Sequence, residues 1–295
     1  MPDAAWPALP LSTWQDTHDT LHMLVQMVGK VRLGLAPPEP EFGHVALFVT
    51  ARGLTTSPMP CGNRTAQIDF DFIAHQLIVQ TSDGAVRNIA LIPRAVADFY
   101  KDFLALLSEL KIDIETSPIP QEVADQTPFD QDRHHASYDA ESVHRFWQIF
   151  SQADVILKKH RAPFRGRHTP VNVFWGGLDI CYDRFSGRPA SPPPGANWLF
   201  RKSMDAEQIY AGFWPGDARF PEPAFASYVY PKPEGIENVA IRPSGGSWKA
   251  QLGEFILPYE DVRTSTSPEK TVTDFFKSTY EVSADLGKWD RKNLE

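Results

Sequence analysis

The chain has 295 residues, of which 42% are hydrophobic and 22% charged, a composition typical of a globular protein with a sizeable core. Its formal net charge of -8 argues against a general nucleic-acid or anionic-membrane surface. No apolar run approaches the length of a membrane span, and the first residues lack the basic and apolar regions of a signal peptide. The cysteines Cys61 and Cys181 form no CxxC pair, which favours a reducing compartment. We therefore expect a cytoplasmic protein with no nucleic-acid or membrane partner.

The first predicted helix starts near Ser12, because Ser12 and Gln15 have the spacing of a capping box and apolar residues then recur at helical spacing. Runs rich in alternating hydrophobic residues predict the strands that follow: 44–52, 66–73, 76–81 and 86–92. The segment TSDG contains the Asp-Gly pair typical of a tight hairpin between the last two. A second helix at about 94–110 presents apolar residues on one face.

The second half shows the same order of predicted elements. Asp139 is expected to cap a helix, and the Ser267–Pro268 pair is a typical start for the last one. Between them, the stretch FWGGLDICYDRFSGR at 174–188 begins like a buried strand and ends with charges. Antiparallel strands flanked by helices predict an α+β fold class. Neither GxGxxG after a strand nor GxxxxGKS/T occurs, so the common nucleotide-binding loops are absent from the sequence.

Three ordered matches predict an internal duplication. LHMLVQMV resembles VHRFWQIF, ALFVTAR resembles DICYDR, and VADFYK resembles VTDFFK. We expect two pseudo-symmetric helix–antiparallel sheet–helix repeats packed as one body, at 12–118 and 138–290, joined by a linker at 119–137. The second repeat is longer, and we assign most of the difference to an inserted loop at 186–223. Features that only one repeat has are the better candidates for function.

Two groups of histidines have spacings that could bind a metal. His18 and His22 lie four residues apart on the first helix, and His134, His135 and Asp139 lie close together in the linker. The structural alternatives are that the helix histidines hydrogen-bond neighbouring strands and that the linker residues cap the following helix. We favour the structural alternatives and assign no metal ligand.

The arginines at the strand ends are the more specific candidates. A guanidinium on a buried strand face needs an acidic partner or a bound anion. In the structural alternative, Arg184 pairs with Asp179, Asp183 or Glu254, and Arg52 pairs likewise in its own half. In the functional alternative, these arginines and their neighbours form a ligand site: Arg52, Arg184 and Arg188 bind an anionic group, and Trp175 and Trp214 supply an apolar wall.

The chain also resembles an uncharacterised bacterial family, domain of unknown function 5996. The resemblance rests on ordered motifs along nearly the whole chain, among them RGLTTSPMP, FDFIAHQLIVQTSDG, FWGGLDICYDRFSGR, LGEFILPYEDVR and STYEVSADLGKWDR. It implies no established activity. Family members have a segment similar to SPVHFFWG where this chain has TPVNVFWG, so Asn172 stands in place of a family histidine. They carry Ser-His-Glu where this chain has Asp205, Ala206 and Glu207, which weakens a metalloenzyme hypothesis for this protein.

These observations lead to one function hypothesis and two alternatives. We expect binding of a small anionic or aromatic molecule in a cleft at the strand ends of the second repeat, with Glu207 or Glu254 as the acid–base group if a reaction occurs. The first alternative is a protein-interaction or scaffold role for the Pro-rich aromatic loop, and the second is a metal-dependent enzyme. The sequence assigns no cofactor and leaves both turnover and a homodimer open.

Overall fold

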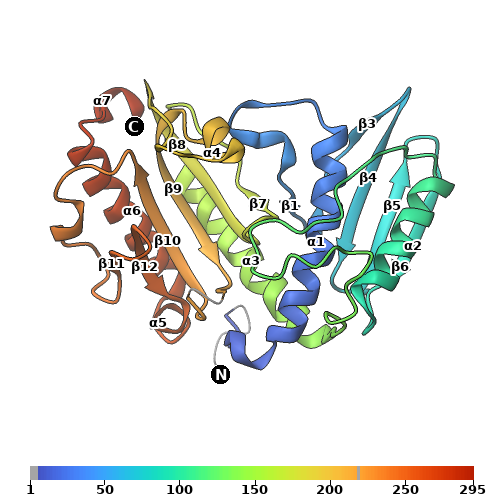
Figure 1. Cartoon of the computed structure of the whole chain (residues 1–295). Coiled ribbons are helices and arrows are strands. Elements are labelled where there is room, and N and C mark those ends of the chain that lie inside the picture. Colours follow the sequence, from blue (N-terminus) through green and yellow to red (C-terminus); the bar gives the residue numbers. More distant parts are fainter. Residues whose placement is uncertain (1–5, 218–219) are drawn as a thin grey trace.

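The structure is a computed structural model that describes residues 6–217 and 220–295. It contains two antiparallel sheets flanked by helices, so the predicted mixed α and β composition is confirmed (Figure 1). In each half a long helix precedes a six-stranded sheet, and a further helix follows it. This order agrees with the expected helix–sheet–helix arrangement, whereas the duplication itself stays a prediction.

The first sheet has the order β1-β2-β4-β5-β6, and β3 also pairs with β4. Its strands are β1 (Phe48–Val49), β2 (Gly53–Thr55), β3 (Met59–Cys61), β4 (Arg64–Asp71), β5 (Gln76–Thr81) and β6 (Val86–Ala90). The hairpin between β5 and β6 turns at the predicted TSDG segment, where Gly84 adopts a φ of 94° that a residue with a side chain rarely adopts.

The second sheet has the order β11-β12-β10-β9-β8-β7. Its strands are β7 (Asn172–Phe174), β8 (Asp179–Pro189), β9 (Ala206–Trp214), β10 (Ala224–Tyr230), β11 (Ser247–Lys249) and β12 (Glu254–Pro258). The segment 186–223, expected as an inserted loop, therefore contains the end of β8, a short helix and all of β9. The end of β9 reads GFWPG, which resembles a turn in the sequence, and this strand was not predicted.

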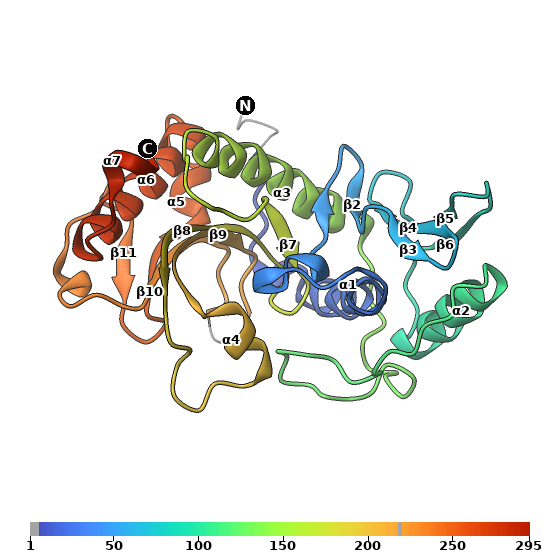
Figure 2. The ribbon, with the colours of Figure 1, turned by 90° about the horizontal axis from the view of Figure 1, so that it is seen from above.

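The helices pack mainly on one side of each sheet. They and the short 3-10 turns are η1 (Leu11–Thr13), α1 (Gln15–Leu35), η2 (Pro40–Val45), α2 (Val96–Glu109), α3 (Ala140–Arg161), α4 (Trp198–Ser203), η3 (Ile236–Asn238), α5 (Tyr259–Arg263), α6 (Pro268–Leu286) and α7 (Arg291–Leu294). In Figure 2, α3 and α6 lie on one side of β8 and β9, and α4 lies on the opposite side. None of the helices in the described part of the chain has the length and apolar character needed to cross a membrane.

Of the three helix starts predicted from local signals, two are confirmed and one is wrong. The Asp139 carboxylate accepts a hydrogen bond from the Ser142 amide at 2.6 Å and caps α3 as predicted. Pro268 occupies the first position of α6, where its missing N–H costs nothing. The predicted capping box at Ser12 is wrong, because Ser12 lies in η1 and α1 begins only after Trp14.

The two halves join through backbone and side-chain contacts at their centre. Leu47 and Val173 form an antiparallel bridge, with N–O distances of 2.7 and 2.9 Å, next to β1 and β7. The Trp147 indole of α3 donates to the Thr50 carbonyl of the first half at 3.1 Å. One extensive core of buried apolar side chains includes residues from both halves.

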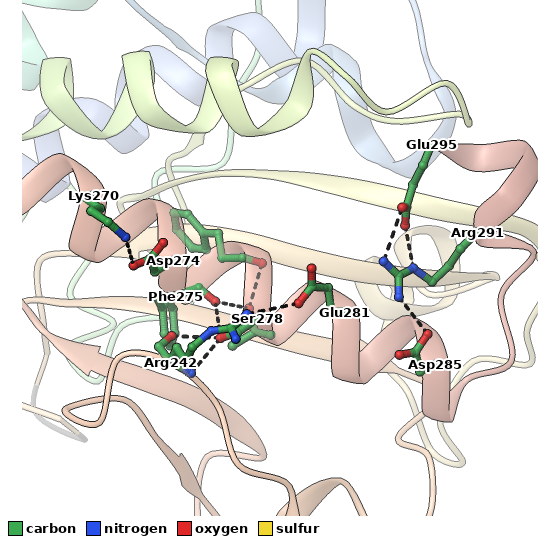
Figure 3. A network of polar contacts seen from close by, with 11 residues as sticks. Arg242, Lys270, Asp274, Phe275, Ser278, Glu281, Asp285, Arg291 and Glu295 are labelled. Atoms are coloured by element: carbon green, nitrogen blue, oxygen red, sulfur yellow. Dashed lines mark hydrogen bonds and ion pairs between the residues drawn. The ribbon is translucent and has the colours of Figure 1, made fainter.

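The last helices are fastened by polar contacts on their outer side (Figure 3). The Ser278 hydroxyl of α6 donates to the Arg242 carbonyl at 2.8 Å and accepts from the Arg242 amide at 2.9 Å. Arg291 of α7 bridges Asp285 and Glu295 at 2.9 and 2.6 Å. These contacts fix the end of the described chain against α6, on the helix-covered side of the second sheet.

Candidate functional site

The two faces of the second sheet differ in chemistry. Side chains alternate along a strand, so β8 directs Ile180, Tyr182 and Arg184 towards α3 and α6. The opposite face, which we call the outer face, carries polar side chains instead. Its central residues are Asp179, Cys181 and Asp183 of β8, Gln208, Tyr210 and Gly212 of β9, and Tyr228 of β10.

A row of directly paired residues crosses the outer face. Asp183 lies opposite Tyr210, and Tyr210 lies opposite Tyr228. The two phenol rings stack with centroids 4.8 Å apart and an interplanar angle of 10°. Paired side chains on one sheet face touch directly, so Asp183 lies at one end of an aromatic pair.

Gly212 allows the Tyr210 side chain to lie along its own strand. A Cβ atom on Gly212 would lie 2.3 Å from the Tyr210 hydroxyl, so only glycine leaves room for it. In this position the hydroxyl donates to Oδ2 of Asp179 at 2.7 Å. One carboxylate of the outer face is thereby satisfied by a neutral donor.

Two buried oxygen atoms of the outer face lack a hydrogen-bond partner among the described residues: Oδ1 of Asp183 and Oε1 of Gln208. Asp183 is 9% exposed and Gln208 is 4% exposed. They come from adjacent strands: Asp183 pairs with Tyr210, and Gln208 pairs with Phe185, the next pair on the same face. Buried acceptors of this kind normally have a partner, and a missing one costs about 1–3 kcal/mol. Two of them on one sheet face therefore mark a candidate place for a ligand or solvent donor.

Burial and neighbouring acids change the protonation of this face. Burial, with Asp179 and Glu41 nearby, raises the pKa of Asp183 to about 8. Burial also raises the pKa of Asp179, although the Tyr210 hydroxyl opposes that shift. Strongly perturbed acids gathered on one surface are typical of functional sites. Asp183 therefore holds a proton at neutral pH and can give it up.

A turn from the first half supplies a further acid to the site. In η2, Glu41 and Phe42 have φ angles of 52° and 57°, in the left-handed region that residues with side chains rarely occupy. Glu41 lies 3.0 Å from a guanidinium nitrogen of Arg167, and burial raises its pKa. The Glu41 charge acts on Asp183, so η2 brings an acid of the first half to the outer face of the second sheet.

The short helix α4 covers part of the same region (Figure 2). Trp198 of α4 packs edge-on against Phe42, with ring centroids 4.8 Å apart. Met204, which ends α4, has its sulfur 3.1 Å from the Gln208 amide nitrogen. The α4 segment and η2 thus lie beside each other over the outer face.

Arg184 lies on the other face of the sheet, among aromatic rings. It is 4% exposed, its guanidinium donates to the His160 carbonyl, and its central carbon lies 4.2 Å from the Tyr280 ring centroid. In the described part of the chain no ion pair joins Arg184 to an acid. The expected pairing of Arg184 with Asp179, Asp183 or Glu254 is wrong. The two aspartates point to the opposite face of β8, and Glu254 lies on β12.

Arg188 and Glu207 are brought together, but as a structural pair. The Arg188 guanidinium contacts Glu207 at 2.6 Å and donates to the carbonyls of Gly287 and Lys288 just after α6. The Ser186 hydroxyl donates to the same Glu207 oxygen at 2.8 Å. The Arg188 guanidinium, predicted to bind an anionic group, and the Glu207 carboxylate, predicted as the acid–base group, therefore bind each other instead of a ligand.

The other predicted ligand-binding residues lie apart from one another. Arg52 is half-exposed and pairs with Asp71 of the first sheet at 2.6 Å, so its predicted acidic partner in its own half is confirmed. Trp175 is buried against α1, and its indole donates to the Val45 carbonyl at 3.0 Å. Of the predicted residues, only Trp214 of β9 and Glu254 of β12 lie on the outer face, on strands that β10 separates.

The histidines make the structural contacts of the favoured alternative. His22 donates to the Trp175 carbonyl at 2.8 Å, and burial lowers its pKa to about 4. His135 lies 2.7 Å from Asp132, and Asp139 caps α3. Across residues 6–217 and 220–295 no three or more His, Cys, Asp or Glu side chains are arranged to hold a metal ion.

Open depressions also occur on the first half. One of them lies beside Cys61, Arg64 and Lys111, and another beside Tyr100 and Arg133. In the first, Arg64 is held by Asp83 at 2.7 Å and by the carbonyls that end α2. These depressions contain no buried acceptor without a partner in the described chain, which distinguishes them from the outer face.

The sequence analysis missed most of the outer face. Asp183 was considered only as a partner of Arg184, and Gln208, Tyr210 and Glu41 were not considered at all. The alternation Asp-x-Cys-x-Asp in DICYDRF places three ionisable side chains on one strand face and is the signal that could have found the site.

Comparison with known proteins gives a family without an assigned activity. Residues 6–295 match the family model of a family of unknown function, DUF5996. No match was found among curated proteins or among solved structures. The geometry of the site is therefore the basis for assigning a function.

Proposed function

The chain belongs to the DUF5996 family of unknown function, and from its site we propose that the protein binds a small molecule on the outer face of the second sheet. The observation that carries the proposal is the pair of buried, unpartnered acceptors, Oδ1 of Asp183 and Oε1 of Gln208, within the part of the chain that the structure describes. A bound donor would satisfy both and recover the free energy that their burial costs.

The aromatic pair supports the same proposal. Binding sites for small molecules combine apolar and aromatic walls with a few convergent polar groups. Tyr210 and Tyr228 supply stacked rings, while Asp183 and Gln208 supply the polar groups. The helix α4, which carries Trp198, lies on the side from which a ligand would be covered (Figure 2), and Phe42 packs against Trp198.

The anionic ligand expected from the sequence is not retained in this proposal. Arg184 faces α3 and α6, and Arg188 is held by Glu207 and the end of α6. The outer face instead presents the carboxyl groups of Asp179 and Asp183, which repel an anion when they are ionised.

The proposal is tested by screening a chemically mixed library of small molecules for an increase in melting temperature. We expect hits for the wild-type protein that are lost in Asp183→Asn and in Gln208→Leu. The matched control is Asp69→Asn, because Asp69 is also a strand aspartate but has its donors in Gln67 and Gln80 of the first sheet. Hits that persist in both outer-face variants would place binding elsewhere and overturn the proposal.

One observation favours the alternative of an interaction protein. Trp198 and Phe200 of α4 are 57% and 46% exposed, and exposed aromatic side chains on one short helix are typical of contact surfaces. In this alternative α4 would contact a protein, so Phe200→Ala would weaken protein association without affecting the small-molecule hits.

A further inference from the structure

We infer that the ligand of the outer face carries a cationic nitrogen, which Asp183 and Gln208 bind through their unpartnered oxygens. This inference rests on the proposed function and adds to it the chemical class of the ligand. It is argued from the balance of charge, the kind of polar atoms that are free, and the aromatic surroundings.

The outer face has more acids than bases. Asp179 is held by a neutral phenol, and in the described chain Asp183 has no cationic partner. Arg167 is paired with Glu41 at 3.0 Å, is half-exposed, and stacks on the Phe185 ring at 4.2 Å. When Asp183 loses its proton, its buried charge needs a partner, and a bound cation would supply one.

The free polar atoms are both acceptors. Oδ1 of Asp183 and Oε1 of Gln208 can receive hydrogen bonds, and neither can donate one when the aspartate is ionised. An ammonium group has several N–H donors and can reach acceptors on two adjacent strands. An anionic group would place further acceptors against these and leave all of them unsatisfied.

The aromatic side chains favour the same charge. Tyr210 and Tyr228 follow Asp183 in one cross-strand row, and the faces of aromatic rings attract cations. The helix α4 lies over this face (Figure 2), and its Trp198 packs against Phe42 of η2. The site therefore combines a carboxylate with aromatic rings, the two kinds of group that bind alkylammonium ions best.

Binding of a cation requires Asp183 to be ionised, so cation binding is coupled to release of the Asp183 proton. Below about pH 8 the carboxyl holds a proton, which passes to the buffer when the ammonium binds. Two charged groups act on the pKa of Asp183: Asp179 on β8 and Glu41 on η2, which is paired with Arg167. The other titratable side chains of this face are Cys181 on β8, Tyr210 on β9, Tyr228 on β10 and Glu254 on β12.

The test compares ligands of similar size and different charge. Ethylammonium, tetramethylammonium and putrescine are titrated by calorimetry at constant ionic strength, beside ethanol, acetate and succinate. We expect the cations to bind, to release protons in two buffers of different ionisation enthalpy, and to bind more tightly at pH 9 than at pH 6.5. Asp183→Asn should lower the affinity for the cations by about tenfold or more, and Asp69→Asn should leave that affinity unchanged.

The possible failures are distinguishable. If neutral or anionic molecules bind in a manner that depends on Asp183 and Gln208, and the cations do not, the inference is overturned while the proposed function stands. If no compound of any class shows a dependence on these two residues, both fail. Asp179→Asn serves as a second variant, since loss of one charge at the rim of the site should weaken cation binding even if Asp183→Asn does not fold.

Discussion

The Tyr210 hydroxyl donates to Oδ2 of Asp179 across 2.7 Å, and this bond links β9 to the first residue of β8 on the outer face. It is the contact that satisfies one acid of the site without neutralising its charge. Burial raises the pKa of Asp179, and the hydrogen bond from Tyr210 limits the rise because it favours the ionised form.

Tyr210→Phe should therefore destabilise the fold by about 1–3 kcal/mol, because it leaves a partly buried carboxylate without its donor. The loss should grow as rising pH ionises Asp179, whose pKa burial raises. Urea unfolding of the variant and the wild type measures it. The matched control is Tyr228→Phe, since the Tyr228 hydroxyl lies only at 3.5 Å from the Gln208 amide nitrogen and should cost less. Equal losses in the two variants would contradict the assigned hydrogen bond.

The stability of the protein should fall as the pH rises from about 6.5 to 8. Asp183 has a pKa of about 8 when folded and an ordinary value near 3.8 when unfolded, so between these values the folded state holds a proton that the unfolded state has lost. The free energy of unfolding then decreases with pH by up to about 1.4 kcal/mol per unit. The pKa values of Asp179 and Glu41 are also raised, so these groups likewise make the free energy of unfolding fall as the pH rises.

Two other groups limit the pH window. The pKa of His22 is lowered from 6.5 to about 4, so the unfolded state binds more protons in that range and the slope there has the opposite sign. The pKa of Lys30 is lowered from 10.5 to about 8 by burial, so stability should rise again above pH 8. We expect a minimum near pH 8, measured by urea unfolding at fixed ionic strength. In Asp183→Asn the decline should flatten, and a wild-type curve that rises between pH 6.5 and 8 would refute the assignment.

The elements that were predictable from the sequence are those with local signals. The cap at Asp139, the Pro268 start and the TSDG hairpin each depend on a few adjacent residues, and the structure confirms all three. The start of α1 was not predictable from Ser12, because a 3-10 turn takes up the residues that would have formed the capping box.

The candidate site was not predictable in the same way, because it depends on strand order. Asp183 and Tyr210 meet only because β9 pairs with β8, and Glu41 reaches them only because η2 of the first half packs near α4. Alternation along DICYDR puts Arg184 on the face of Ile180 and Tyr182, but alternation alone could not show that this face is the one covered by helices.

Arg184→Ala should destabilise the fold and leave ligand binding to the outer face unchanged in the fraction that folds. Arg184 is buried between aromatic rings, and truncating a large buried side chain costs about 2–5 kcal/mol. Arg184→Lys should not restore stability, because an ammonium cannot stack as the planar guanidinium does. Thermal and urea unfolding test this, with the half-exposed Arg188→Ala as the milder control. A variant of normal stability that has lost ligand binding would return Arg184 to the site.

Two glycines of α1 should respond in opposite ways to alanine. A Cβ atom at Gly29 would lie 2.2 Å from Cδ1 of Trp175, whose ring is held by its bond to the Val45 carbonyl and cannot withdraw easily. A Cβ atom at Gly34 would meet only the flexible end of Ile114 at 2.4 Å. Alanine favours a helix over glycine by about 1 kcal/mol, whereas overpacking costs about 1–3 kcal/mol. Gly29→Ala should therefore destabilise the protein and Gly34→Ala should leave it unchanged or stabilise it. Equal unfolding midpoints for the two variants would show that Trp175 does not fix the distance between α1 and the second half.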